Sequence, residues 1–413
     1  MVPKGWSSVQ AQDVCKSISV GVVIKPTQYY VPEGYGVKAF RSANVREGFI
    51  NDSDWVYFSH EGHAINKKSH LKTGDVLIVR TGYPGTACVV TPEFEGSNAI
   101  DIVIARPDMD KIIPEYLCAY TNSHIGKSQV LDLQGGMAQK HLNVGAYQVL
   151  KINLPPLREQ KKIAQILSTW DKAITVTEKL LVNSQQQKKA LMQQLLTGNK
   201  RLLDENGVRF SGEWKITKLI QMGKVVSGGT PDTNMAMYWE GDILWLTPTD
   251  VTALTGRFVS NTSRKITPAG LLNSSAVLLP KGSLMVCTRA TIGALAISTS
   301  EICTNQGFKN IIPNEGFNIE FIYYLLQMNT NEMIKKSSGS TFLELSKKDF
   351  ETLSFSCPFI KEQQKIAAVL SAADTEISTL EKKLACLKDE KKALMQQLLT
   401  GKRRVKVDEA VAV

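Results

Sequence analysis

The chain has 413 residues, of which 43% are apolar and 21% charged, so it carries enough apolar side chains to build folded cores. Its 49 Lys and Arg outnumber its 39 Asp and Glu, and the formal net charge of +10 favours a polyanionic partner such as nucleic acid. No apolar run approaches the ~20 residues of a bilayer-spanning helix, and the N-terminus lacks the features of a signal peptide. The seven cysteines are scattered singly, which suits a reducing compartment. We therefore expect a soluble, cytoplasmic protein with reduced thiols.

The first 154 residues contain short β-rich segments punctuated by Gly, Pro and Asn, a pattern typical of an α+β domain. An apolar strand is predicted over 73–80, an amphipathic helix over 114–122, and a final strand over 149–153. A glycine-containing loop is predicted over 134–142, and the polar segment 41–72 is predicted to be a long loop. Loops of this kind often carry function.

Residues 155–200 are predicted to form a long helix. Pro155 and Pro156 precede it and Gly198 ends it, as expected for helix boundaries. Apolar and small residues recur at alternating steps of four and three, the heptad pattern of a coiled coil. The positions of this seam are Ile163, Leu167, Trp170, Ile174, Thr177, Leu181, Ser184, Lys188, Leu191 and Leu195.

A second α+β domain is predicted over 201–356. It repeats the plan of the first, with a strand over 281–289, a short amphipathic helix over 319–328, and a final strand over 352–356. The glycine-containing segment 337–345 and the polar segment 248–265 are again predicted to be loops.

The rest of the chain repeats the first helix. The eleven residues from Lys188 to Gly198 recur letter for letter from Lys391 to Gly401, 203 residues later, and the match extends upstream from Ser371 to Lys361 at the same offset. The chain is therefore a tandem duplication. A second helical segment is assigned to 357–405, followed by a tail over 406–413. Its seam positions are Ile366, Leu370, Ala373, Ile377, Leu380, Leu384, Leu387, Lys391, Leu394 and Leu398.

Two matching apolar stripes on one soluble chain need a partner, and each is the simplest partner for the other. We predict an antiparallel coiled coil about 58 Å long at ~1.5 Å per residue, with the globular units at opposite ends and a pseudo-twofold axis between them. A lone helical spacer or a dimerisation stalk is the alternative. The polar seam residues Thr177, Ser184 and Lys188 either fix the register or mark a docking place for another subunit.

The sequence shows no recognisable catalytic or cofactor site. Gly126-Lys127-Ser128 resembles the end of a phosphate-binding loop, but Thr121 occupies the position of the required glycine. The segment 153–157 resembles an amino-methyltransferase motif only superficially, because Leu154 intervenes and no aromatic residue follows. His60, His63 and His70 lack further ligands at metal-binding spacing beyond Glu61. We predict a non-catalytic recognition subunit without cofactor or metal.

The layout resembles the specificity subunits of type I restriction-modification systems. The resemblance covers the whole chain and rests on the doubled helix entry at 154–164 and 357–367, and on the Leu-Leu-Thr-Gly endings at 195–198 and 398–401. The second domain adds Gly282-Ser283-Leu284-Met285 and Asn305-Gln306-Gly307, whereas the first has Asn98-Ala99-Ile100 in place of the latter.

This resemblance implies two target-recognition domains, each reading one half of a split double-stranded DNA sequence, separated by helices that act as a spacer. The helices would also seat two methyltransferase (modification) subunits, and restriction subunits with translocase activity would join them. Two equivalent docking surfaces would explain why the helices stayed alike, and two different half-sites would explain why the domains diverged. The length of the rod would set the unread gap.

DNA readout requires polar and basic side chains that reach phosphates and base edges. In the first domain the predicted DNA-contacting residues are Tyr29, Lys38, Arg41, Lys67, Lys68, Arg80, Tyr83, Gln139, Lys140 and His141. In the second they are Thr230, Thr247, Arg257, Arg264, Lys265, Arg289, Ser340, Thr341 and Lys347. Any one of them is alternatively a solvated surface residue, and Arg80 and Arg289 stand out because both follow apolar strands.

Two other interpretations remain. A coiled-coil adaptor that binds only proteins would assemble with its partners without binding DNA. An enzyme with unfamiliar motifs would transfer methyl groups or cut DNA on its own.

Overall fold

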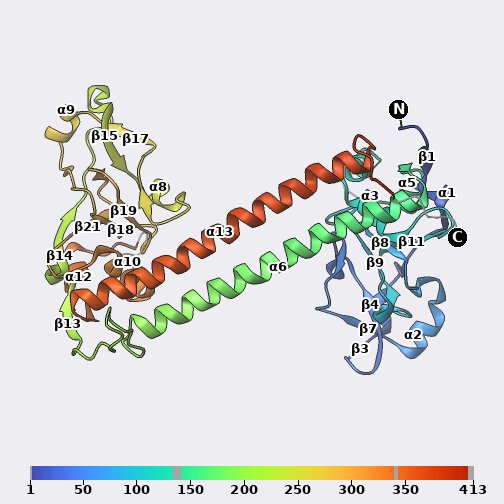
Figure 1. The fold of residues 1–413 in the computed structure, drawn as a ribbon, viewed down its shortest axis with the longest axis horizontal. Helices are drawn as coiled ribbons and strands as arrows, with labels where there is room; N and C mark the ends of the chain where they lie inside the picture. Colours follow the sequence, from blue (N-terminus) through green and yellow to red (C-terminus); the bar gives the residue numbers. More distant parts are fainter. Residues whose placement is uncertain (1, 134–140, 339–342, 408–413) are drawn as a thin grey trace. The chain divides into compact units, whose positions relative to one another are not determined.

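The computed structural model describes residues 2–133, 141–338 and 343–407. The chain divides into two compact units: unit 1 comprises 1–178 and 383–413, and unit 2 comprises 179–382. Two long helices, α6 (Leu157–Leu195) and α13 (Ile360–Leu399), begin in one unit and end in the other (Figure 1). Each unit therefore joins a globular domain to the first part of one helix and the last part of the other.

Unit 1 has two four-stranded sheets and two strand pairs. One sheet has the order β2 (Cys15–Val20), β11 (Ile102–Pro107), β8 (Val76–Val79), β9 (Ala87–Val89), and all its pairings are antiparallel. The other has the order β10 (Asn98–Ala99), β4 (Gly36–Phe40), β7 (Val56–Ser59), β3 (Tyr30–Val31). The pairs are β1 (Ser7–Gln10) with β12 (Lys151–Leu154) and β5 (Val45–Arg46) with β6 (Phe49–Ile50). The helices of this domain are α1 (Ala11–Val14), α2 (His60–Ile65), α3 (Pro114–Asn122), α4 (His124–Asp132) and α5 (Val144–Gln148).

Unit 2 follows the same plan with more strands in its main sheet. That sheet has the order β14 (Gly223–Ser227), β21 (Phe308–Pro313), β18 (Leu284–Cys287), β19 (Leu295–Ser298), β16 (Phe258–Val259). A second sheet has the order β17 (Arg264–Ile266), β15 (Trp239–Leu246), β20 (Cys303–Thr304), and β13 (Lys215–Lys218) pairs with β22 (Ser354–Cys357). The helices of this domain are α7 (Leu219–Met222), α8 (Pro248–Thr252), α9 (Pro268–Leu272), α10 (Ile319–Met328), α11 (Thr330–Lys335) and α12 (Lys347–Thr352).

The two domains share one topology despite their unlike sequences. The pairs β2 and β14, β8 and β18, and β11 and β21 occupy the same positions in their sheets. The hairpins after β8 and β18 close with the same bonds, because the amides of Val79 and Cys287 donate to the carbonyls of Thr86 and Ala294. The predicted α+β tandem repeat is confirmed.

A short helix lies between the main sheet and the long helices in each unit (Figure 1). α3 and α10 have the predicted bounds, and the six residues of α10 from Phe321 to Leu326 are buried. The helix is covered on one side by the sheet and on another by α13, so it contributes apolar side chains to both faces. Burial of this kind is the main source of stability in such a core.

The long helices pair in antiparallel directions, as predicted. In unit 1, Asp171 and Glu178 of α6 pair with Lys391 and Lys388 of α13, so the residue number rises on one helix as it falls on the other. In unit 2, Ser184 donates a hydrogen bond to Glu376 (2.9 Å), and Lys188 pairs with Asp374 (2.6 Å). No seam position of either helix is fully exposed.

The polar seam residues are satisfied by these contacts. Ser184 and Lys188 bond to the facing helix, whereas the Thr177 hydroxyl donates to the carbonyl of Ala173 within its own helix. Ser184 and Lys188 therefore favour one alignment of the two helices, which supports the register-fixing alternative.

The predicted long loops are wrong. Segment 41–72 contains β5, β6, β7 and α2, and segment 248–265 contains α8, β16 and most of β17. The prediction failed because these strands are short and only a few apolar residues, such as Val45, Phe58 and Val259, anchor them in the core. Each strand has only two to four residues, so the period-2 signal is too brief to recognise.

His63 and His70 of segment 60–70 are held by internal contacts. The rings of His63 and His70 stack at 3.8 Å, His63 bonds to the Asn98 side chain, and His70 bonds to the carbonyl of His63. Within the described residues no three His, Cys, Asp or Glu side chains gather at metal-binding distance. No helix of the described chain is long and apolar enough to cross a membrane.

All seven cysteines are free thiols, and Cys386 on α13 is the exposed one. Burial raises the pKa of Cys88 to about 12, which leaves that thiol unreactive at neutral pH. The thiol of Cys386 donates to Glu390 (Sγ–Oε1 3.4 Å), and this hydrogen bond raises its pKa above the ordinary value.

Cys386 should therefore be the fast-reacting thiol of the native protein, although slower at a given pH than an isolated cysteine. Because the thiolate is the reactive form, Glu390→Gln should lower the pKa and move the pH–rate curve to lower pH. The measurement is the rate of labelling by a chromogenic disulfide between pH 7 and 10, with Cys386→Ser as the control. An unchanged curve in the Glu390 variant would show that the hydrogen bond has no influence on the thiol.

Candidate nucleic-acid interface and helix junctions

The repeated Glu-Gln at each helix entry joins the helix to its domain. In unit 1 the buried Gln160 side chain accepts a hydrogen bond from the amide of Ile113 (3.0 Å) and donates to the carbonyls of Lys111 and Pro155 (2.9 Å each). These bonds hold the residues that lead into α3, so α3 and α6 are fixed to each other through one side chain.

Unit 2 repeats this junction. Gln363 accepts from the amide of Asn318 (3.0 Å) and donates to the carbonyls of Gly316 (3.3 Å) and Pro358 (2.8 Å). The residues before α3 and α10 therefore correspond to each other. The repeated glutamine is explained by geometry, since a side-chain amide has an oxygen that accepts from a backbone N–H and an NH2 group that donates to two carbonyls.

The neighbouring glutamate in each unit binds a tryptophan and an arginine. Glu159 accepts hydrogen bonds from Nε1 of Trp6 (3.2 Å) and from Nε (3.0 Å) and Nη2 (2.5 Å) of Arg404. Arg404 follows the end of α13, and Trp6 lies before β1. The carboxylate therefore ties together the beginning of the domain, the start of α6 and the segment after α13.

Unit 2 contains the same three-way contact. Glu362 accepts from Nε1 of Trp214 (3.3 Å) and from Nε and Nη2 of Arg201 (2.6 Å each). Arg201 follows α6 and stands 203 positions before Arg404, the offset of the repeat. The bidentate arginine–carboxylate geometry is the strongest form of such a pair.

The two arginines predicted to read DNA from the strand ends differ in their surroundings. The amide of Leu142 donates to the carbonyl of Arg80, and the amide of Leu345 donates to that of Thr288. Arg80 therefore corresponds to Thr288, and Arg289 lies one residue further along. Because side chains alternate between the faces of a strand, the two arginines point to different environments.

Arg80 is 8% exposed and its guanidinium is engaged inside the domain. It forms an ion pair with Asp101, donates to the carbonyl of Leu142 (3.0 Å), and contacts the ring of His141. Arg289 has a side chain that is 46% exposed, and the ion pair that it forms with Glu344 is long at 3.9 Å. Arg289 is thus the better placed of the two for an external ligand.

The other predicted residues of the first domain lie in several places. Lys67, Lys68 and Tyr83 are exposed, and Tyr83 is 84% exposed at the hairpin after β8. Lys38 pairs with Asp52 (2.9 Å), and this contact, together with the Trp55 N–H, lowers the pKa of Asp52. Tyr29 packs on Phe58, and Arg41 donates to the carbonyl of Asp54. Gln139 and Lys140 lie outside the described residues, whereas His141 contacts Arg80 and Thr81.

In the second domain most predicted residues already have partners. The Thr230 hydroxyl donates to Gln306, Thr247 caps α8, and the guanidinium of Arg264 stacks on Trp239 at 3.6 Å. Arg257 is bound by acidic residues beside the long helices. Lys347 pairs with Glu351 (3.6 Å), Lys265 lies in β17, and Ser340 and Thr341 lie outside the described residues.

The sequence reasoning missed Lys309 of β21. It is 6% exposed, and burial lowers its pKa, while Glu344 nearby opposes that shift. It pairs across the sheet with Val286 of β18, close to the end of the strand that leads to Arg289. The sequence signal for Lys309 is a lysine inside a strand, in the pattern Phe308-Lys309-Asn310-Ile311.

Comparison with known protein families decides the classification. The sequence model of the type I restriction modification DNA specificity domain matches twice, over residues 3–183 and 211–388. The chain belongs to this family. Its role is DNA specificity, and the family supplies recognition rather than catalysis.

Relatives of known class agree with this assignment. The chain is 40% identical over 172 residues to the specificity subunit of the type I restriction enzyme MjaIX of Methanocaldococcus jannaschii, a match that covers 41% of this chain and 40% of that protein. It is 25% identical to the MjaVIII specificity subunit of the same organism, over 98% of this chain and 94% of that one. A chain from a solved type I restriction-modification system shares the fold, with a TM-score of 0.59, 19% identity, and coverage of 98% of this chain and 100% of that one.

The two helix-entry glutamates, Glu159 and Glu362, should be important for the stability of this specificity protein. Glu159→Gln and Glu362→Gln each leave an arginine without its carboxylate at a partly buried site, and each should cost roughly 3 kcal/mol of unfolding free energy. The loss should appear as a lower midpoint in calorimetry.

Glu178→Gln is the matched control. Glu178 of α6 likewise forms an ion pair, with Lys388 of α13, but both side chains are about half exposed (46% and 52%). The loss of unfolding free energy should therefore stay within about 0.5 kcal/mol. Equal destabilisation by the control and the junction variants would contradict a special role for the junctions.

Proposed function

We propose that this specificity protein reads a bipartite, asymmetric DNA sequence, with one domain for each half-site. In this proposal residues 1–154 and 201–356 are the recognition domains, 155–200 and 357–405 are helical segments, and 406–413 is a tail. The observation that carries the proposal is the contrast between two conserved junctions and two diverged domains. The Glu-Gln side chains bind corresponding residues in both units, while the polar residues at the strand ends differ.

The same contrast supports two docking places for modification subunits. Two identical methyltransferase subunits would need two equivalent surfaces, and the repeated segments of α6 and α13 are the alike parts of the chain. Restriction subunits would join this assembly in the cytoplasm. The net charge of +10 suits a DNA partner.

DNA-contacting residues are proposed from the predicted set according to exposure. Lys67, Lys68 and Tyr83 in the first domain, and Arg289 and Lys347 in the second, have exposed side chains. Arg80 and Arg257 form ion pairs with carboxylates inside their own units, so we propose that they stabilise these units rather than contact DNA. Gln139, Lys140, Ser340 and Thr341, which lie outside the described residues, stay in the proposed set.

A domain exchange tests the two-reader proposal. Replacing residues 1–150 with the equivalent domain of a related specificity protein should change one half of the methylated sequence and leave the other half unchanged. The measurement is single-molecule methylome sequencing of cells that carry the hybrid with its modification subunits. A change in both halves, or in neither, would rule out independent reading.

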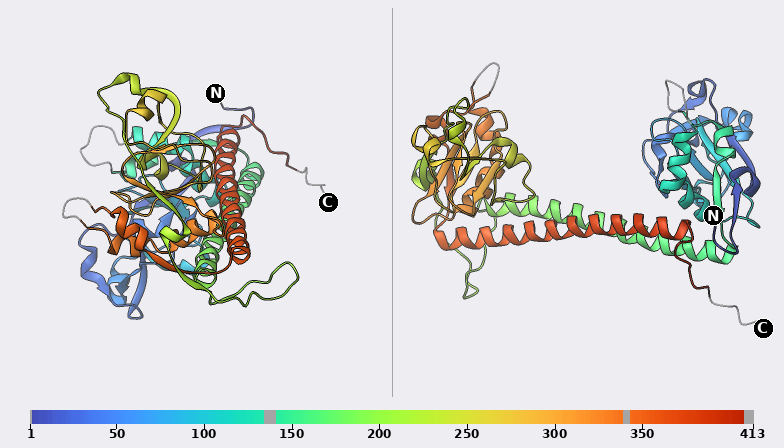
Figure 2. Two further views of the ribbon diagram at one scale, coloured as in Figure 1. Left: turned by 90° about the vertical axis from the view of Figure 1, so that its left-hand side faces the viewer. Right: turned by 90° about the horizontal axis from the view of Figure 1, so that it is seen from above.

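Arg289→Ala tests direct readout in the second domain. If Arg289 contacts a guanine, its loss should weaken DNA binding of the assembled complex by about 1–3 kcal/mol. Arg209→Ala is the control, because Arg209 is exposed and bridges Leu203 in the segment that follows α6. That segment projects away from the strands of unit 2 (Figure 2). Fluorescence anisotropy with labelled duplex measures the effect. Equal affinity of both variants would remove Arg289 from the interface, and assembly without any DNA binding would favour the protein-binding adaptor instead.

A further inference from the structure

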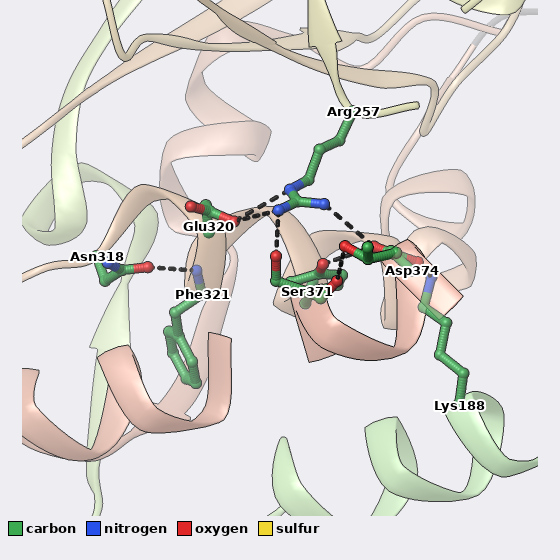
Figure 3. Close-up of polar contacts among 9 residues, drawn as sticks. Lys188, Arg257, Asn318, Glu320, Phe321, Ser371 and Asp374 are labelled. Carbon is green, nitrogen blue, oxygen red and sulfur yellow. Dashed lines mark hydrogen bonds and ion pairs between the residues drawn. The ribbon is translucent and has the colours of Figure 1, made fainter. Parts of the chain in front are cut away.

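Arg257 of unit 2 is clamped between the domain and the long helices (Figure 3). Its Nε and Nη2 donate to one carboxylate oxygen of Glu320 (3.0 and 2.8 Å), and Nη2 also donates to the hydroxyl of Ser371. Nη1 lies 3.5 Å from Asp374. The Tyr324 hydroxyl donates to the same Asp374 carboxylate (2.6 Å) and fills the space beside the guanidinium.

Unit 1 keeps the acceptors of this clamp without the arginine. The repeat offset of 203 places Ser168 and Asp171 at the positions of Ser371 and Asp374. Gln160 and Gln363 accept matching hydrogen bonds from the amides of Ile113 and Asn318, the residues that precede α3 and α10. Glu115 therefore corresponds to Glu320, and Ala119 corresponds to Tyr324.

Within the part of unit 1 that the structure describes, the arginine has no counterpart on the equivalent strand edge. In unit 2, β16 pairs with β19, and Arg257 precedes β16. In unit 1 the β5–β6 hairpin takes this place beside β9, where the amide of Gly48 donates to the carbonyl of Ala87. A Cβ on Gly48 would lie 4.0 Å from the Asp171 carboxylate, so a residue without a side chain faces it.

In unit 1 a pocket of about 530 Å³ lies at the place that corresponds to Arg257 and Tyr324 of unit 2. Its lining includes all four corresponding residues: Glu115, Ala119, Ser168 and Asp171. A second pocket of about 820 Å³ adjoins it and shares Gly48, Asp171 and other lining residues, so the two form one groove in unit 1. The Asp171 side chain is 46% exposed, compared with 25% for Asp374.

The charge of the smaller pocket favours a cation. Its charged lining residues are one lysine and five carboxylates: Lys391, Glu47, Asp52, Glu93, Glu115 and Asp171. Glu47, Asp52 and Asp171 have lysine partners, whereas within the described residues no ion pair engages Glu93 or Glu115. An acidic pocket on a chain of net charge +10 repels DNA phosphates and attracts basic protein side chains.

We propose that this pocket of unit 1 binds the guanidinium of an arginine side chain presented by a partner protein. Arg257 shows how the same acceptors hold such a group in unit 2. The three acceptors are spread around a planar fork, which suits arginine better than the compact ammonium of lysine. The proposal goes beyond the proposed DNA reading and does not require it, so a failure of one leaves the other standing.

The test uses the full chain with methyl-labelled methionines and short peptides as probes. Met395 lines both pockets, and Met192, its counterpart in the repeat, packs against the core of unit 2 and serves as an internal control. The probes are acetyl-Gly-Arg-Gly-amide, its lysine analogue, and its citrulline analogue, which keeps the shape without the charge. Free guanidinium chloride at the same concentration is the fourth probe.

The arginine peptide should shift the Met395 methyl resonance saturably and leave that of Met192 unchanged. Glu115→Gln should weaken this binding about tenfold through the lost charged hydrogen bond, whereas Glu381→Gln, on an exposed part of α13 outside the pocket, should not. Ala119→Tyr should abolish the shift, because it places in the pocket the side chain that unit 2 has.

Four results would overturn the proposal. No shift at Met395, or an equal shift with the citrulline peptide, would show that the pocket does not select the cation. Equal affinity for free guanidinium would indicate a small-ion site rather than a docking place for a protein. Binding that is unaffected by Glu115→Gln would place the peptide elsewhere.

Discussion

The bidentate pair between a helix-entry glutamate and an arginine beyond the other helix is the contact on which each unit depends. Glu159 with Arg404, and Glu362 with Arg201, join segments that are distant in sequence. The Glu362 side chain is 3% exposed, so its charge is largely removed from water and needs the arginine and the Trp214 N–H to remain stable. Because the arginine follows one copy of the helix and the glutamate begins the other, neither copy completes a unit alone.

This constraint explains which parts of the duplicated chain stayed alike. A change in the glutamate, the adjacent glutamine or the arginine would disturb one unit at the place where three segments meet. The ion pairs between the helices add alignment: Asp171 with Lys391 and Asp374 with Lys188 are the same pair taken from the two copies in opposite order. At the strand ends the domains share backbone hydrogen bonds, such as those to the carbonyls of Arg80 and Thr288, but not the side chains, so their sequences could diverge while the topology persisted.

Much of the fold could be predicted from sequence because its signals are long or repeated. The eleven-residue repeat and the heptad seam identify α6 and α13, and the bounds of α3 and α10 follow from helix signals alone. The short strands β5, β6 and β16 could not be predicted, since two residues carry no period. The interface residues were harder still. Whether an arginine after a buried strand faces inward, as Arg80 does, or outward, as Arg289 does, depends on a one-residue difference in register that appears only when the loops are placed.

The two units also show where a duplicated architecture loses its symmetry. Unit 2 closes the space beside α10 with its own Arg257 and Tyr324, while unit 1 has Gly48 at the strand edge and Ala119 on α3, and keeps Glu115, Ser168 and Asp171. Removing a cation normally relaxes the selection on the carboxylates that bound it, because like charges left together repel. Asp171 keeps the internal cation Lys391, whereas within the described residues no ion pair engages Glu115, and in our proposal a cation from outside the chain binds there. In our proposal the helix surfaces of the two units are equivalent, but the surroundings beside α3 in unit 1 differ from those beside α10 in unit 2. Two copies of one partner would therefore meet different surroundings on the same chain.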